Sequence, residues 1–432
     1  MPVLYSDSDE YDIITVLGKG TFGEVTKCWK RASSQYVAIK ILQNYNFRKG
    51  VIKCELKILR MLESVDSNKF CIVQFIESFS DDTKLYLVFE LLEQSLYEYQ
   101  KENGFVPLPI KHIRSITKQV LIALQKLKEL SIVHTDIKPE NIMLVEKAQF
   151  PFKIKLIDFG SACLLPDIQQ IKGPYIQSRF YRAPEILLGL PFFEKLDMWS
   201  LGCVMAELHL GWPIYPGTNE YDQIRYIVET QGLPSDQILE VASKTHHFFK
   251  KARQFNSTYK WRLKSIDEYQ AETMVHPLET RTRSLSSLDQ LATINPKTVF
   301  PDKDLKAELF DQYMMVALIK KILIFDPRQR CTASAALKHP FITMQKLKSE
   351  YKNTKYYKLS AQALHIALDP CKKAEGHFHC CQSFITSCYL NNQHYETVHT
   401  HQKPQAIKQS MEDDLDHSVM DEFEKEVSSQ LY

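Results

Sequence analysis

The sequence predicts an α+β protein built from a small β-rich part and a larger, mainly helical part. Up to about residue 91, strand-like stretches surround one amphipathic helical segment. From about residue 109, apolar residues recur at helical spacing instead. We therefore expect a small antiparallel sheet with one main helix, followed by a helical lobe.

The β-rich part contains five strand-like stretches and one helix. The stretches are YDIITVL, EVTKCWKR, YVAIKIL, KFCIVQFIESF and KLYLVFELL. Between the third and the fourth, residues 51–63 place apolar side chains on one face of a helix, at Ile52, Leu56, Leu59 and Leu62.

The helical part opens with a long amphipathic stretch over residues 109–130. Its apolar face would contain Ile113, Ile116, Val120, Leu124 and Leu127. Further helices are expected at 196–210 and 220–231, and an irregular polar insertion at about 250–300. The expected domains are an extension over 1–10, a small lobe over 11–91, a large lobe over 92–342 with a surface insert around 245–300, and a polar tail over 343–432.

Composition argues against several classes of protein. The net charge is +2 and no basic face is apparent, so we expect no direct nucleic-acid binding. No apolar run approaches the ~20 residues that span a bilayer, and the first residues lack the apolar core of a signal peptide. Ten cysteines without a CxxC pair are typical of reduced thiols. We expect an intracellular monomer, in the cytoplasm, the nucleus or both.

A glycine-rich loop precedes the second strand. Gly18, Gly20 and Gly23 have GxGxxG spacing, and glycine lets a backbone approach phosphate oxygens closely. The loop lies between two strands rather than between a strand and a helix, which favours a flap over the phosphates of ATP. A glycine-rich hairpin without a ligand stays open as the alternative. The candidate nucleotide-binding residues here are Leu17, Gly18, Lys19, Gly20, Thr21, Phe22, Gly23, Glu24 and Val25.

A lysine and a glutamate in the small lobe form a candidate pair. Lys40 ends the apolar strand VAIK, and Glu55 lies among apolar residues of the following helix. An unpaired carboxylate there would be costly, so we expect the two to form an ion pair. The pair would direct the Lys40 ammonium at the α- and β-phosphates of a nucleotide.

The string His134-Thr-Asp-Ile-Lys-Pro-Glu-Asn141 is the most specific in the chain. Asp136 can accept the proton of a substrate hydroxyl, and Lys138 can neutralise a transferring phosphoryl group. Asn141 and the later Asp158 offer the hard oxygen ligands that Mg²⁺ prefers. Phosphoryl transfer requires positioning and charge neutralisation, which these groups supply.

In this order, the motifs resemble those of the protein kinase superfamily over about residues 11–342. The resemblance implies the two-lobed eukaryotic protein kinase fold, ATP and Mg²⁺ as cofactors, and protein substrates. It implies catalytic roles for Asp136, Lys138, Lys40 and Glu55. It also implies a Glu185–Arg330 pair and structural roles for His134 and Asp197, with Asp197 holding the catalytic loop. Adenine would contact Val25, Ala38, Met143, the gatekeeper Phe89 and the hinge from Glu90 to Leu92.

A finer resemblance comes from PYIQSRFYRAPEILLG and DMWSLGCVMAEL. These strings are similar to the homeodomain-interacting protein kinases and the related dual-specificity tyrosine-regulated kinases. Lys138 within KPEN resembles the serine/threonine class. The resemblance implies a preference for proline after the phosphorylated residue, activation by autophosphorylation on Tyr175, and transcriptional regulators as candidate substrates.

One departure concerns activation. Thr135 replaces the arginine that most kinases carry before the catalytic aspartate, so Arg179 and Arg182 become the candidates to bind a phosphate on Tyr175. The rival interpretation of the chain is a pseudokinase or scaffold that acts through the insert or the tail.

The tail offers weaker signals. Its cysteines and histidines could suggest a zinc site or acylation at Cys380 or Cys381, but their spacing fits no usual zinc finger. A plain polar tail is the third alternative. The acidic segment 411–432 has apolar residues every four positions, which suggests a short helix or a frayed terminus.

Overall fold

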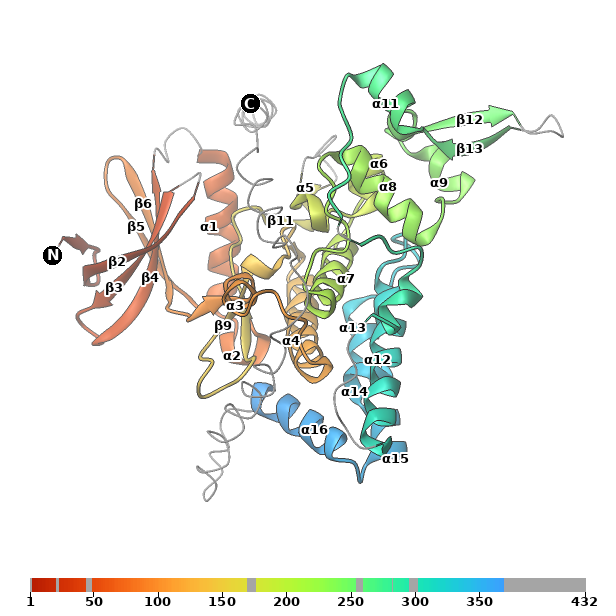
Figure 1. The fold of residues 1–432 in the computed structure, drawn as a ribbon. Helices are drawn as coiled ribbons and strands as arrows, with labels where there is room; N and C mark the ends of the chain where they lie inside the picture. The colour runs from red at the N-terminus through yellow and green to blue at the C-terminus, as the bar shows by residue number, and fades with distance from the viewer. Residues whose placement is uncertain are drawn as a thin grey trace.

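The computed structural model describes residues 2–20, 23–43, 49–168, 176–253, 259–281, 283–294 and 302–368. A curved sheet with one long helix forms a small lobe beside a larger helical lobe (Figure 1). The predicted α+β, two-lobed fold is confirmed.

The small-lobe sheet has six antiparallel strands in the order β1-β2-β3-β4-β6-β5. They are β1 (Val3–Tyr5), β2 (Glu10–Gly20), β3 (Gly23–Lys30), β4 (Gln35–Gln43), β5 (Phe75–Ser80) and β6 (Lys84–Glu90). The sequence did not predict β1, which pairs with β2. The fourth predicted strand begins late, because Asp66 caps the short helix α2 (Ser67–Phe70) and Cys71 ends it at φ 55°.

Helix α1 (Lys49–Glu63) occupies the predicted position. Ile52, Leu59 and Leu62 are buried in the main core, and Leu56 packs against it. The apolar face inferred from helical spacing is therefore the face that holds α1 in place.

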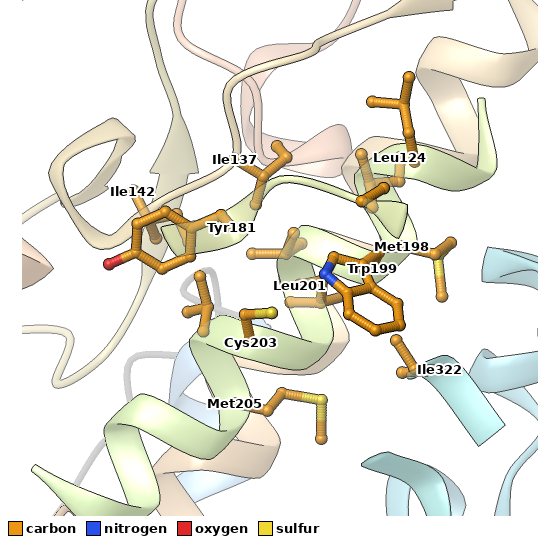
Figure 2. Packing of buried hydrophobic residues seen from close by; sticks show 14 of the residues in the cluster. Leu124, Ile137, Ile142, Tyr181, Met198, Trp199, Leu201, Cys203, Met205 and Ile322 are labelled. Carbon is orange, nitrogen blue, oxygen red and sulfur yellow. The ribbon is translucent and has the colours of Figure 1, made fainter. Parts of the chain in front are cut away.

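The large lobe is built around α4 (Ile110–Glu129) and α7 (Lys195–Leu210). The five apolar residues predicted for α4 are all buried. Every residue of α7 from Leu196 to Leu210 is buried, as expected for a helix at the centre of a lobe. Figure 2 shows Trp199, Cys203 and Met205 of α7 among side chains from other elements, including Tyr181 and Ile322.

Further elements complete the large lobe. They are α3 (Leu96–Glu102), α5 (Leu165–Ile168), α6 (Pro184–Leu188), α8 (Glu220–Gln231), α9 (Asp236–Val241), α10 (Thr245–Phe248), α11 (Ile266–Thr273), α12 (Asp302–Ile322), α13 (Ala333–Leu337) and α14 (Pro340–Thr343), with strands β7 (Gln94–Ser95), β8 (Ile132–Val133), β9 (Ile142–Leu144), β10 (Ile154–Leu156) and β11 (Cys163–Leu164). No helix in the described ranges is long and apolar enough to cross a membrane.

The insertion is more regular than the sequence predicted. Strands β12 (Phe249–Arg253) and β13 (Tyr259–Leu263) form an antiparallel ribbon, and α11 follows it. Ser265 and Glu268 form a reciprocal capping box that starts α11.

The chain also continues past residue 342 as ordered helices, which the sequence analysis placed in a polar tail. Helices α15 (Gln345–Tyr351) and α16 (Lys355–Leu368) run back along the large lobe (Figure 1). Tyr356 donates a 2.7 Å hydrogen bond to Asp311, which also pairs with the buried Arg114. The tail cysteines and the predicted helix at 411–432 lie outside the described residues.

Glu185 and Arg330 form a fully buried ion pair, as the sequence predicted. Arg330 donates to the two carboxylate oxygens at 2.6 and 2.7 Å, and both side chains have no exposed surface. Further Arg330 bonds reach the carbonyls of Ile324 and Lys195, both at 2.9 Å. The pair therefore joins α6 to the segment before α13.

We expect Arg330→Leu to lower the free energy of unfolding by about 3–5 kcal/mol, because it leaves the Glu185 carboxylate buried without its partner. Denaturant unfolding would measure the loss. Arg328→Leu is the matched control, since Arg328 is 75% exposed and water screens its pair with Asp326, so its loss should be much smaller. Equal losses in the two variants would contradict the role given to the buried pair.

Candidate active site

Lys40 contacts two carboxylates, one in each lobe. Its Nζ lies 2.9 Å from Glu55 Oε1 and 3.0 Å from Asp158 Oδ1. β4 supplies Lys40, α1 supplies Glu55, and Asp158 follows β10. The predicted Lys40–Glu55 pair is thus present, and Asp158 meets the same ammonium.

Lys40 and Asp158 each stabilise the charged form of the other side chain. Burial alone would lower the pKa of Lys40, but Asp158 and Glu55 outweigh burial and raise it. Burial would raise the pKa of Asp158, but Lys40 lowers it to about 2. At neutral pH the site therefore contains an ammonium and an ionised carboxylate in contact.

The backbone around Asp158 is conformationally restricted and leaves little space for a side chain at position 160. Asp158 has φ 60°, and the Gly160 N–H donates to its Oδ1 at 3.3 Å. A Cβ on Gly160 would lie 3.2 Å from that Oδ1 and 3.3 Å from Lys40 Nζ. A side chain at position 160 would therefore press on the two groups that face each other here.

The glycine-rich loop joins β2 to β3, as predicted. Gly18 pairs with Val25, Lys19 with Glu24 and Gly20 with Gly23. A Cβ on Gly18 or Gly20 would meet open space, whereas one on Gly23, at φ 154°, would lie 1.9 Å from the Ile41 carbonyl oxygen. Gly23 is thus required by the sheet, while Gly18 and Gly20 leave space beside the strand. Leu17 is half exposed on the same strand, and Thr21 and Phe22 lie outside the described residues.

Asp136 is surrounded by donors. Asn141 Nδ2 donates to its Oδ2 at 2.9 Å, and Lys138 Nζ lies 3.0 Å from the same oxygen. Ser178 Oγ donates to Oδ1 at 2.7 Å and accepts from Lys138 Nζ at 3.0 Å. A serine hydroxyl thus sits against both the carboxylate and the ammonium of the catalytic loop.

The sequence analysis did not predict the contacts that Ser178 and Thr135 make with the segments around Asp136 and Asp158. Ser178 lies in the string QSRFYR, which was used only for the family resemblance. Thr135 was noted as a missing arginine, but its hydroxyl donates to the Ser161 carbonyl at 2.6 Å and its φ is 65°. Only the folded chain reveals that these residues tie the catalytic loop to the segment after Asp158.

Asp197 of α7 fixes the backbone of the segment that contains Asp136. Its two carboxylate oxygens accept the backbone N–H groups of His134 at 2.8 Å and Thr135 at 2.9 Å. Burial raises the pKa of Asp197 to about 7, against the lowering effect of these two bonds. His134 Nε2 lies 2.9 Å from the Ile157 carbonyl, and burial lowers the pKa of its ring.

The residues expected around adenine lie on neighbouring strands. Ala38 pairs with Phe89 across β4 and β6, and Val25 lies on the adjoining β3. Leu92 follows β6, and Met143 lies on β9. Val25, Ala38 and Phe89 thus share the small-lobe sheet, and Met143 lies on a strand of the large lobe.

The hinge residue Glu90 is fixed through its side chain. Lys155 Nζ, which is almost fully buried, lies 2.6 and 2.7 Å from the carboxylate oxygens of Glu90. Ser67 Oγ and the Gln74 N–H also donate to this carboxylate, at 2.9 and 2.6 Å. The hinge is therefore bound both to β10 and to the segment that follows α1.

The two arginines considered for activation differ. Arg182 is buried, donates to the Ile176 and Gln177 carbonyls, and pairs with Glu220 at 3.1 Å. Arg179 Nη1 donates to the Thr218 carbonyl at 2.6 Å. Its buried Nε has no hydrogen-bond partner among the residues that the structure describes. Tyr175 lies outside those residues.

Metal ligation by protein groups alone is not supported. Within the described ranges, no three His, Cys, Asp or Glu side chains gather in a metal-binding arrangement. Asn141 and Asp158 can therefore supply only part of the ligand set for a cation.

Comparison with known families matches residues 11–342 to the protein kinase domain. The chain belongs to the protein kinase family. A protein kinase domain uses ATP and a divalent metal.

The relatives refine this assignment. The chain is 56% identical over 373 residues to mouse homeodomain-interacting protein kinase 4 and 55% identical to the human protein of that name. It is 46% identical over 346 residues to mouse homeodomain-interacting protein kinase 2, an alignment that covers 80% of this chain and 29% of that relative. The first two alignments cover 85% of this chain but 61% of each relative, so this kinase matches about three-fifths of their length.

Proposed function

We propose that this kinase transfers the γ-phosphoryl group of ATP to serine or threonine of protein substrates. The observation that carries the proposal is the setting of Asp136, whose Oδ1 accepts a serine hydroxyl at 2.7 Å while Lys138 contacts both partners. A substrate hydroxyl in place of that of Ser178 would meet the same base and the same cation.

In the proposed mechanism, Asp136 orients the substrate hydroxyl and accepts its proton as the oxygen attacks. Lys138 neutralises charge on the transferring group. Lys40, held by Glu55, binds the α- and β-phosphates, and the glycine-rich strand pair covers them. Val25, Ala38, Met143 and the hinge enclose adenine.

Asn141 and Asp158 are the proposed Mg²⁺ ligands. Asn141 uses Nδ2 to bond Asp136, and no described residue donates to its Oδ1, so a neutral oxygen remains for a cation. Phosphate and water oxygens would complete the hard-oxygen shell that Mg²⁺ requires. When bound, the ion would neutralise phosphate charge.

The same residues disfavour a pseudokinase. A scaffold would have no need for Lys40 between two carboxylates or for Asp136 between a lysine and an asparagine, because buried charges are costly to keep. We place the activity inside the cell, in the cytoplasm, the nucleus or both. The names of the relatives suggest homeodomain proteins as partners to test first.

Replacing the base tests the proposal. Asp136→Asn should keep nucleotide binding and the melting temperature but lower turnover of a protein substrate by about 10²–10⁴-fold. Steady-state kinetics and thermal unfolding would be measured together. Asp289→Asn, at an exposed carboxylate, is the control and should keep full activity. Unchanged turnover in Asp136→Asn would remove Asp136 from the mechanism.

Arg182 motivates a substrate preference. Its Nη2 donates to the Gln177 carbonyl at 2.9 Å, so this carbonyl already has a donor. A substrate amide at this place would compete for it, whereas proline has no N–H to satisfy. We therefore propose proline directly after the phosphorylated residue.

A degenerate peptide library phosphorylated by the purified chain should show proline enriched at that position above every other residue. A library in which proline is not enriched would reject the preference while leaving the catalytic assignment intact.

Tyr175 is the proposed activating site. A phosphotyrosine adds about −1.5 to −2 charge and strong acceptor oxygens, which arginine guanidinium groups match. Arg179, four residues downstream, carries the buried Nε without a described partner, and such a group is costly to leave unsatisfied. Arg182 is already engaged with carbonyls and Glu220, so Arg179 is the stronger of the two candidates.

We expect protein made in bacteria to carry phosphate on Tyr175, and the Asp136→Asn variant to lack it, because the chain would modify itself. Mass spectrometry would decide this. Tyr175→Phe should lower peptide phosphorylation without shifting the melting temperature by more than about two degrees, since the substitution removes only a hydroxyl group. Full activity of unmodified wild-type protein would overturn this activation scheme.

A further inference from the structure

The β12–β13 ribbon carries an unusual concentration of positive charge. Strands β12 and β13 contain five Lys and Arg residues and no Asp or Glu. The ribbon projects from the large lobe on the side away from the sheet (Figure 1). The sequence analysis considered charge over the whole chain and did not identify this local concentration.

The strand register sorts these charges onto two faces. Lys250 lies opposite Arg262, and both pair with Glu268 of α11. Lys251 lies opposite Trp261, with its Nζ 4.9 Å from the ring centroid, and Arg253 lies opposite Tyr259. The face with Lys250 and Arg262 therefore has a carboxylate, that of Glu268, which offsets its positive charge. The second face carries Lys251, Arg253 and Tyr259.

The second face combines cations with exposed apolar surface. The nearest carboxylate to Lys251 is that of Glu240, at 3.9 Å, and both side chains are about half exposed or more. Tyr259 is 63% exposed, and Val241, at the end of the helix next to the ribbon, is 73% exposed. Two-stranded ribbons bury little surface of their own, so such a face is suited to contact with a further segment.

The last 22 residues of the chain have the complementary character. Residues 411–432 contain eight acidic residues and one lysine, a net charge of −7. Since the whole chain has +2, residues 1–410 carry +9. Leu415, Val419, Phe423, Val427 and Leu431 recur every four positions, so a helix would present one apolar face between acidic side chains.

The connecting chain is long enough for the two to meet. Forty-three positions separate Leu368, where α16 ends, from Met411. A flexible chain of that length has an end-to-end distance on the order of 35 Å, comparable with the size of one lobe. Tethering also gives the segment a high effective concentration at the ribbon.

We propose that the acidic segment 411–432 docks in the same molecule on the Lys251–Arg253–Tyr259 face of the β12–β13 ribbon. Carboxylates of the segment meet the ribbon cations, and its apolar residues cover Tyr259 and Val241. The proposal concerns a surface remote from Asp136 and does not depend on the phosphoryl-transfer function.

Carbodiimide cross-linking of the full chain tests the proposal, because this reagent joins a lysine to a carboxylate only when they are in contact. Peptide mass spectrometry should find Lys251 joined to acidic residues between 412 and 426, with the yield falling as salt rises. A mixture of ¹⁵N-labelled and unlabelled protein should yield links within one isotope only. Links between isotopes would assign the segment to a second copy and overturn docking within the molecule.

Arg253→Glu should lower the yield of these links by about fivefold, since it reverses a ribbon charge without removing a reactive lysine. Arg328→Glu is the control at another exposed arginine and should leave the yield unchanged. Asp413→Asn/Asp414→Asn/Asp416→Asn changes only the segment and should also lower the links made by Glu422, Glu424 and Glu426.

Links from the acidic segment to lysines elsewhere, with none to the ribbon, would overturn the proposal. So would a DNA duplex that the wild type retains and Arg253→Glu loses, in the absence of ribbon links, because the ribbon would then serve nucleic acid.

Discussion

The arrangement of the whole site depends on one partly buried ammonium, that of Lys40. Burial penalises its charge, and the carboxylates of Glu55 and Asp158 compensate for that penalty only when the sheet, α1 and the segment after β10 are all in position. The contact therefore reports on the relative placement of the two lobes. A shift of α1 would leave a charge without its partner.

The large lobe also holds an irregular loop, the segment from His134 to Asp136, in a fixed position. The catalytic loop has backbone N–H groups with no strand partner, and an unpaired buried N–H is costly. Asp197 accepts two of them from within the fully buried α7, where Trp199 and its neighbours fix the helix. The core of the lobe thus determines where Asp136 lies.

The sequence predicted those features that a local pattern or a single residue's chemistry determines. Apolar spacing located α1 and α4, and the cost of an isolated carboxylate located Glu55 as the partner of Lys40, whereas the Glu185–Arg330 pair was predicted from the family resemblance. It was uninformative where the answer depends on distant residues. The packing of α16 rests on Tyr356 reaching Asp311, and the role of Ser178 rests on a loop that places its hydroxyl beside Asp136. Neither contact leaves a periodic or local signal.

The buried charges and the exposed charges of this chain have different physical consequences. Buried pairs such as Lys155–Glu90 add little net stability, because desolvation offsets attraction, but they tolerate few alternative geometries. Their positions at the hinge, between the lobes and beside α6 are where alternative geometries would disturb nucleotide or substrate. On the β12–β13 ribbon, Lys250 and Arg262 pair with Glu268 while staying partly exposed, and Lys251 meets Glu240 only at 3.9 Å. Such exposed pairs constrain the geometry less than buried pairs do, because water screens their attraction.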